Sequence, residues 1–96
     1  MGNLHNDMND KLFEAILTLE TIEDCYKFFE DVCTIKELQD MGQRFATAIL
    51  LSKGTNYEKI TKELGVSAAT ISRVSRCLNY GSGGYKKALE SIKEEK

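Results

Sequence analysis

A short run of small, hydroxylated and basic residues between positions 67 and 76 could contact the edges of DNA bases. Serine and threonine hydroxyls bond bases or phosphates, alanine and threonine methyls contact the thymine methyl, and arginine reaches guanine or phosphate. No acidic residue occurs between positions 66 and 79 to repel phosphate. These residue types predict a DNA-reading face made of Ser67, Ala68, Ala69, Thr70, Ser72, Arg73 and Arg76.

The apolar spacing of residues 57–79 predicts a helix-turn-helix that would carry this face. Ile60 and Leu64 are four residues apart, so they share one face of a first helix. Gly65 can end that helix in the left-handed conformation, and Ser67 can cap the next helix. The apolar stripe of the second helix comprises Ile71, Val74 and Leu78. An ordinary helical hairpin with a solvated polar face is the alternative, but the coincidence of these signals favours DNA binding.

Charge is distributed unevenly along the chain, although the net charge is only −2. Residues 1–40 carry ten acidic and three basic side chains, a balance of −7. Residues 57–87 carry six basic and two acidic side chains, a balance of +4. A local positive field favours phosphate contact even in an acidic protein, so we expect Lys59 and Lys62 to contact phosphates. Two solvated faces without a nucleic-acid partner are the alternative.

The residue types that catalysis or metal binding would need do not occur together. His5 is the single histidine, and no carboxylate pair accompanies a base. Cys25, Cys33 and Cys77 are an odd number without metal-site spacing, so we predict free, buried thiols and leave a redox role open. The sequence therefore predicts no enzyme, no catalytic residue, no metal site and no cofactor.

Length and composition predict one soluble all-α domain spanning residues 1–96. The chain contains no proline, so helices can continue uninterrupted. No stretch approaches the roughly 20 apolar residues of a membrane span, and the N-terminus lacks a signal-peptide pattern. We expect a cytoplasmic protein with no membrane partner.

Local capping patterns predict three helices within residues 1–54. The expected capping residues are Asn6 or Asp7 for the first helix, Thr21 with Asp24 for the second, and Thr34 with Glu37 for the third. The third helix should stop near Gly54, and Thr55 or Asn56 should cap the helix that follows. Gly81 should stop the second helix of the helix-turn-helix, and a final amphipathic helix is expected over residues 84–96.

An excess of aromatic residues in the N-terminal half indicates a dimer. Phe28 and Phe29 are adjacent, so they point about 100° apart on a helix, and one small monomer would struggle to bury both faces. A monomer with one exposed aromatic is the alternative. We predict that residues 1–54 form an interlocked homodimer, in which two reading helices would lie one DNA turn, roughly 34 Å, apart.

Three segments of the sequence resemble the Trp repressor superfamily, and in particular the YerC/YecD-type Trp-repressor-related proteins of bacteria. The segments are TIKEL (34–38), GQRFATAILLSKG (42–54) and ITKELGVSAATISR (60–73). The resemblance implies a six-helix fold, an interlocked homodimer and binding to a double-stranded DNA operator. It thereby implies that the chain is a sequence-specific transcriptional regulator, and we expect a repressor.

The resemblance also implies a place for a small effector. Trp repressors hold L-tryptophan between two arginines, with a threonine nearby, and Arg44, Arg73 and Thr34 fall at the matching positions. The family's glycine after the second arginine is replaced by Val74, whose side chain would occupy the space of the indole. We therefore expect DNA binding that does not require L-tryptophan. A regulator gated by tryptophan or by another small anion, and a helical module that binds protein, are the alternatives.

Overall fold

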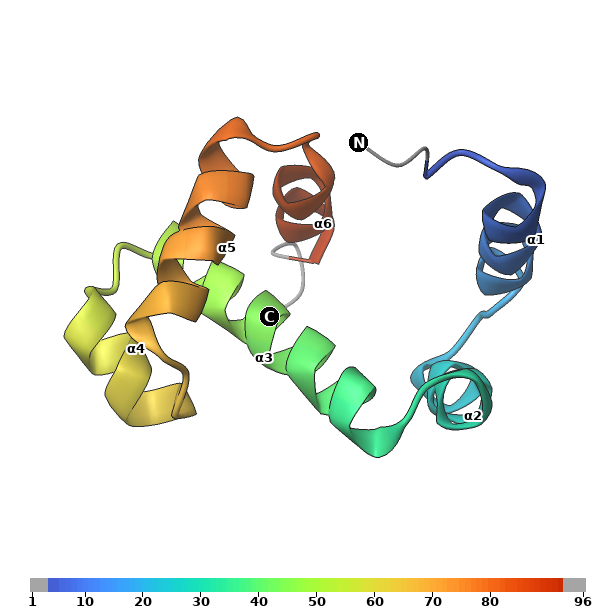
Figure 1. Ribbon diagram of the computed structural model, residues 1–96, viewed down its shortest axis with the longest axis horizontal. Helices are drawn as coiled ribbons and strands as arrows, with labels where there is room; N and C mark the ends of the chain where they lie inside the picture. The colour runs from blue at the N-terminus through green and yellow to red at the C-terminus, as the bar shows by residue number, and fades with distance from the viewer. Residues whose placement is uncertain (1–3, 93–96) are drawn as a thin grey trace. The chain divides into compact units, whose positions relative to one another are not determined.

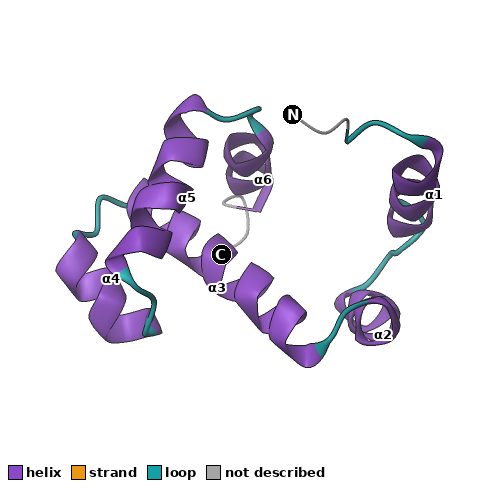
Figure 2. Cartoon of the chain, in the orientation of Figure 1, coloured by secondary structure: helices purple, strands orange, loops and turns teal. Residues whose placement is uncertain are grey.

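The computed structural model describes residues 4–92, and all regular structure in this range is helical (Figures 1 and 2). The six helices are α1 (Asp7–Ile16), α2 (Ile22–Val32), α3 (Ile35–Ser52), α4 (Tyr57–Leu64), α5 (Ala68–Tyr80) and α6 (Gly84–Ile92). The predicted all-α architecture is confirmed. The predicted final helix begins at Gly84 as expected, and its last four positions, 93–96, lie outside the described residues. None of the described helices is long and apolar enough to cross a membrane.

Capping side chains begin the helices where the local patterns predicted. Asn6 caps α1, and its side-chain oxygen accepts from the backbone N–H of Asn9 at 2.8 Å. Asn56 caps α4 in the same way, accepting from the N–H of Lys59 at 2.9 Å. These bonds satisfy backbone donors that have no partner inside the helix. Of the paired alternatives, Asn6 and Asn56 are therefore the caps.

The two predicted capping boxes differ in detail. At α3, the Thr34 hydroxyl accepts from the N–H of Glu37 at 3.0 Å, and the Glu37 carboxylate accepts from the N–H of Thr34 at 2.9 Å. At α2, the Thr21 hydroxyl accepts from the N–H of Asp24 at 3.0 Å. The Asp24 carboxylate, however, accepts from the N–H of Glu20 at 3.2 Å, one residue earlier than a regular box requires.

Glycines end the helices where the chain must turn. Gly65 follows α4 in the left-handed conformation with φ +72°, and its N–H donates to the Thr61 carbonyl at 2.8 Å. Gly54 follows α3 with φ +83°. Gly81 follows α5 for a different reason, because a Cβ atom there would collide with the carbonyl oxygen of Cys77. All three predicted stops are present.

The chain divides into two compact units, residues 1–38 and 39–96. In the first unit, neither α1 nor α2 contains a buried residue. Large apolar side chains are exposed on both helices, including Met8 (80% exposed), Phe13 (57%), Ile22 (77%) and Tyr26 (56%). The first unit therefore presents, in a single chain, apolar surface that soluble proteins normally cover.

The second unit contains the buried core. Ile60, Val66 and Ile71 form a buried cluster, and three half-buried leucines, Leu50, Leu51 and Leu64, pack against it. Thr47 and Ala48 of α3 and Val74 of α5 are also buried. The buried Thr47 hydroxyl donates to the Gln43 carbonyl at 2.8 Å, so its polar group is satisfied. The core thus lies where α3, α4 and α5 meet.

Candidate nucleic-acid interface

The helix-turn-helix is formed by α4, the turn at residues 65–67 and α5. Val66 lies inside the turn and is buried with Ile60 of α4 and Ile71 of α5. The two helices pack against each other next to α3 (Figure 1). Because one buried residue comes from each helix and one from the turn between them, the angle between α4 and α5 is fixed by packing.

The outer face of α5 is exposed and free of acidic residues. Ile71 and Val74 point into the core, whereas the predicted reading residues Ala68, Ala69, Ser72, Arg73 and Arg76 are all exposed. They follow the spacing i, i+1, i+4, i+5, i+8, which places them on one side of a helix. The structure therefore brings five of the seven predicted reading residues together on one exposed face.

The remaining two predicted reading residues, Ser67 and Thr70, form hydrogen bonds with each other. Ser67 caps α5, and its hydroxyl oxygen accepts from the backbone N–H of Thr70 at 3.1 Å. The same hydroxyl donates to the Thr70 side-chain oxygen at 3.2 Å. Ser67 is exposed, but Thr70 is half-buried. These two hydroxyls differ from that of Ser72, which makes no hydrogen bond within the described part of the chain.

Four basic side chains of the helix-turn-helix are exposed. Lys59 and Lys62 are exposed on α4, and Arg73 and Arg76 are exposed on α5. Across residues 4–92, none of these four side chains makes an ion pair with an acidic side chain. Their charges are therefore available to an external anion such as phosphate.

The residues predicted to surround an effector belong to different units. Thr34 is in the first unit, while Arg44, Arg73 and Val74 are in the second. Arg44 is half-buried and Arg73 is exposed. Val74 is only 2% exposed, so its side chain is part of the interior of the second unit. At this position the chain has a packed apolar side chain instead of open space.

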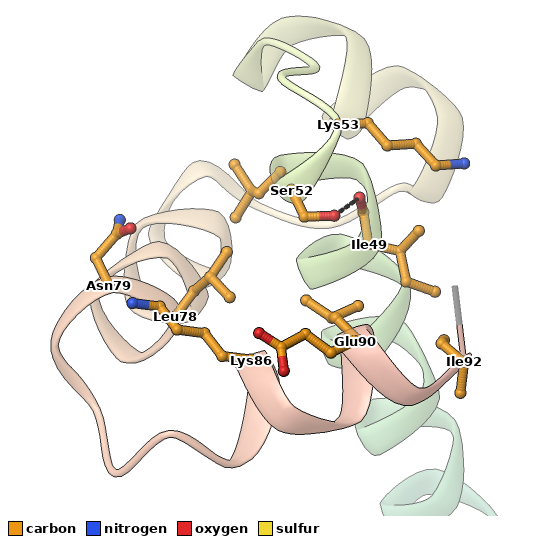
Figure 3. Close-up of a pocket in the computed structure, with 10 residues that line it drawn as sticks. Ile49, Ser52, Lys53, Leu78, Asn79, Lys86, Glu90 and Ile92 are labelled. Carbon is orange, nitrogen blue, oxygen red and sulfur yellow. Dashed lines mark hydrogen bonds between the residues drawn. The ribbon is translucent and has the colours of Figure 1, made fainter. Parts of the chain in front are cut away.

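A groove that the sequence did not predict lies between the end of α3, the end of α5 and α6 (Figure 3). Its volume is about 710 Å³, and its apolar lining comes from Ile49, Leu51, Leu78, Leu89 and Ile92. Its polar lining comes from Ser52, Lys53, Asn79, Lys86 and Glu90. The amphipathic pattern of the last helix was the available signal, but that pattern does not identify which neighbouring helices its apolar residues face. None of the predicted site residues lines this groove.

The cysteines correct one prediction. All three are free, as predicted, but Cys25 and Cys77 are exposed and Cys33 is half-buried. The prediction of burial failed because Cys25 is on a helix with no buried residue, and because Cys77 is off the Ile71–Val74 stripe of α5. Within the described residues, no group of three or more His, Cys, Asp or Glu side chains could hold a metal ion.

Comparison with known proteins agrees with this architecture. The sequence profile of the Trp repressor protein family matches residues 7–93. The chain is 53% identical to the protein YerC of Bacillus subtilis over 85 residues, which cover 88% of this chain and 82% of YerC.

Two solved structures are also similar. A TrpR-like protein from Eubacterium eligens superimposes with a TM-score of 0.91 and 43% identity, covering 97% of this chain and 96% of that one. A Staphylococcus aureus protein of the same fold gives a TM-score of 0.90 and 44% identity, covering 96% and 92% of the two chains. The chain therefore belongs to the Trp repressor protein family, a family of regulatory proteins and not of enzymes.

Proposed function

We propose that this protein is a sequence-specific DNA-binding transcriptional regulator that acts as a repressor by occupying an operator. The observation that carries this proposal is the acid-free, exposed face of α5, which is held against α4 by a buried core. In a helix-turn-helix, the second helix enters the major groove with its first turns against the bases. Membership of the Trp repressor family supports the same function.

The basic residues would bind the phosphate backbone. Lys59 and Lys62 of α4 contact phosphates and set the docking angle, while Arg73 and Arg76 of α5 reach phosphate or guanine. Ala68 and Ala69 are small enough to let the first turn of α5 approach the groove floor. Phosphate contacts supply affinity and register, and contacts to base edges supply specificity.

The protein acts as a homodimer in this proposal. The exposed apolar side chains of α1 and α2 leave the first unit without a core of its own, and a second copy would cover them. The 18-residue α3 extends from the first unit into the second, so that a dimer built on the first unit is directly connected to the reading head. Two reading helices would then engage a two-fold symmetric operator.

Operator binding does not require L-tryptophan in this proposal. The burial of Val74 beside the exposed Arg73 supports this, because in this proposal the valine side chain takes the space that a corepressor indole would need. A buried valine at this position can stabilise the second unit without a ligand. Arg44 and Arg73 remain able to bind a different small anion.

Selection of bound duplexes from a random DNA library, at fixed salt and with or without L-tryptophan, tests this function. The expected result is enrichment of one two-fold symmetric site in both conditions. Enrichment only in the presence of tryptophan would contradict ligand independence. No enrichment in either condition would contradict operator binding and favour a helical module that binds protein.

A further inference from the structure

We propose that Ser67 and Thr70 act as a positioning pair for α5 and do not read bases, so that readout by side-chain hydrogen bonds is left to Ser72 and the two arginines. This inference rests on the proposed function, because it assigns roles within the proposed DNA interface. Residue types alone placed all these side chains together on the reading face. The hydrogen bonds of the structure separate them into two groups.

The Ser67 hydroxyl is already engaged as donor and acceptor with Thr70, and the Thr70 hydroxyl oxygen is its acceptor. Ser67 uses its single proton to donate to the Thr70 oxygen at 3.2 Å and one lone pair to accept from the Thr70 N–H at 3.1 Å. A hydroxyl offers one donor and two acceptor sites, so Ser67 has no donor left for a base. If Ser67 turned towards a base, α5 would lose its cap.

The position of the pair explains how it could act on the whole interface. Ser67 and Thr70 lie between Val66 and Ile71, both of which belong to the buried cluster shared with α4. The first turn of α5 is therefore packed into the core at both of its ends, through Val66 and Ile71. The hydrogen bonds between Ser67 and Thr70 lie between these two buried residues. Loss of these hydrogen bonds would fray the first turn and lower the population in which α5 is positioned for DNA, without changing which side chains meet the bases.

Three exposed side chains farther along α5 differ from Ser67 and Thr70 because they have no hydrogen-bonding partner in the described part of the chain. The side chains of Ser72, Arg73 and Arg76 are exposed, and these side chains make no hydrogen bond or ion pair within residues 4–92. Asn79 is not free in this sense, because its side-chain amide donates to the Ser75 carbonyl at 2.9 Å. Ser72 is therefore the uncharged side chain of this face with an unused hydroxyl.

Operator profiling distinguishes positioning from reading. The affinity of the full chain is measured at fixed salt for the selected operator and for every single-base variant of one half-site. Four proteins are compared: the unaltered chain, Ser67→Ala, Thr70→Val and Ser72→Ala. Loss of a positioning residue should weaken binding to all operators equally, whereas loss of a reading residue should relax the preference at one position.

We expect Ser67→Ala to weaken binding roughly fivefold on every operator, as expected for loss of a helix cap, with the ranking of operators unchanged. Thr70→Val keeps the capped backbone N–H and loses only the contact between the two hydroxyls, so it should weaken binding less, again equally on every operator. Ser72→Ala should flatten the preference at one base position. Ser67→Thr and Thr70→Ser keep both hydroxyls and should restore affinity. Thermal unfolding of each variant, followed by circular dichroism, confirms that binding is measured on folded protein.

The proposal is overturned if Ser67→Ala or Thr70→Val relaxes the preference at a base position, or if neither changes affinity. Failure of the proposed function has a different signature, since the unaltered chain would then show no preferred operator at all. Weak binding by a conservative variant, equal to that of Ser67→Ala, would also overturn the proposal, because the hydroxyl would not be the group that matters.

Discussion

The side chains of α5 and its N-cap form two groups. One group holds the helix in place, and the other is exposed to solvent. Ile71 and Val74 are buried, and the hydroxyls of Ser67 and Thr70 are hydrogen-bonded to each other. The side chains of Ala68, Ala69 and Ser72 are exposed. The predicted DNA interface is therefore a small surface on a rigid support. Substitutions on the exposed side of α5 should change DNA binding, whereas substitutions on its buried side should change the stability of the fold.

Ala68→Glu should weaken operator binding by roughly a hundredfold or more, because it places a negative charge against the phosphates. The fold should be unaffected, since Ala68 is exposed at the first position of α5, where an acidic side chain suits the helix dipole. A DNA mobility-shift titration measures the loss. The matched control is Ser82→Glu, which adds the same charge in the exposed turn between α5 and α6. Equal losses for both variants would show that net charge is responsible and not the reading face.

Val74→Gly should open space beside Arg73 and raise the affinity for L-tryptophan about tenfold above that of the unaltered chain. The same change should lower the free energy of unfolding by about 3 kcal/mol, because a buried valine is removed and a glycine enters a helix. Calorimetric titration and urea unfolding measure the two effects. Val74→Ala separates them, because it removes most of the side chain and avoids the glycine penalty. Micromolar tryptophan binding by the unaltered chain would contradict the prediction.

At the scale of helices, the beginnings and ends of the elements were predictable because their signals are local. Ser67, Thr34 and Gly65 act on backbone groups within four residues, so the sequence alone specifies their roles. The engagement of Thr70 could not be predicted, since it depends on the side-chain rotamer and on the depth of burial. The groove beside α6 depends on how three helices pack, which periodicity does not specify.

Replacing each of two glycines by alanine should change the stability of the protein in opposite directions, because the two glycines have different backbone conformations. Gly65→Ala should destabilise the protein by about 1 kcal/mol, because φ +72° disfavours any residue with a Cβ atom. Gly42→Ala should stabilise it by up to about 1 kcal/mol, because Gly42 is inside α3 and a Cβ there meets no atom within 4 Å. Chemical unfolding of the two variants under identical conditions gives both values. Changes of the same sign would contradict this assignment of backbone roles.

At the scale of the whole molecule, the two units differ in what they can bury. The second unit has a core, while α1 and α2 of the first unit contain no buried residue and expose several large apolar side chains. The aromatic excess of the N-terminal half predicted a surplus of apolar surface, and Phe13 and Tyr26 are exposed. Phe28 and Phe29, from which the prediction was argued, are instead half-buried and pack edge to face with ring centroids 5.4 Å apart. We expect assembly and DNA binding to depend on conditions in two measurable ways.

The melting temperature should rise with protein concentration, because association stabilises the folded chain by mass action. Sedimentation should give the mass of a dimer, and Ile22→Glu should shift it towards the monomer, since Ile22 is 77% exposed on α2. Tyr80→Ser is the matched control, because Tyr80 is similarly exposed but lies at the end of α5 in the second unit. A monomer mass together with a melting temperature independent of concentration would contradict dimerisation.

Operator affinity should fall steeply with salt. If a dimer neutralises about eight phosphates, the slope of log affinity against log salt should be near −7. Arg76→Ala should reduce the steepness by about one for each phosphate that the arginine no longer neutralises. Binding isotherms between about 50 and 200 mM salt give these slopes. A slope near zero would indicate that the basic face does not bind a nucleic-acid backbone.

The absence of buried residues in α1 and α2 has a consequence for how such a regulator would respond to its own abundance in a cell. If those helices become ordered only against a second copy, the population able to occupy an operator grows more steeply than the amount of protein made. Below the dissociation constant of the dimer, doubling the supply of chains would roughly quadruple the active form. Gene dosage and proteolytic turnover would then set the switching point, with no small molecule required.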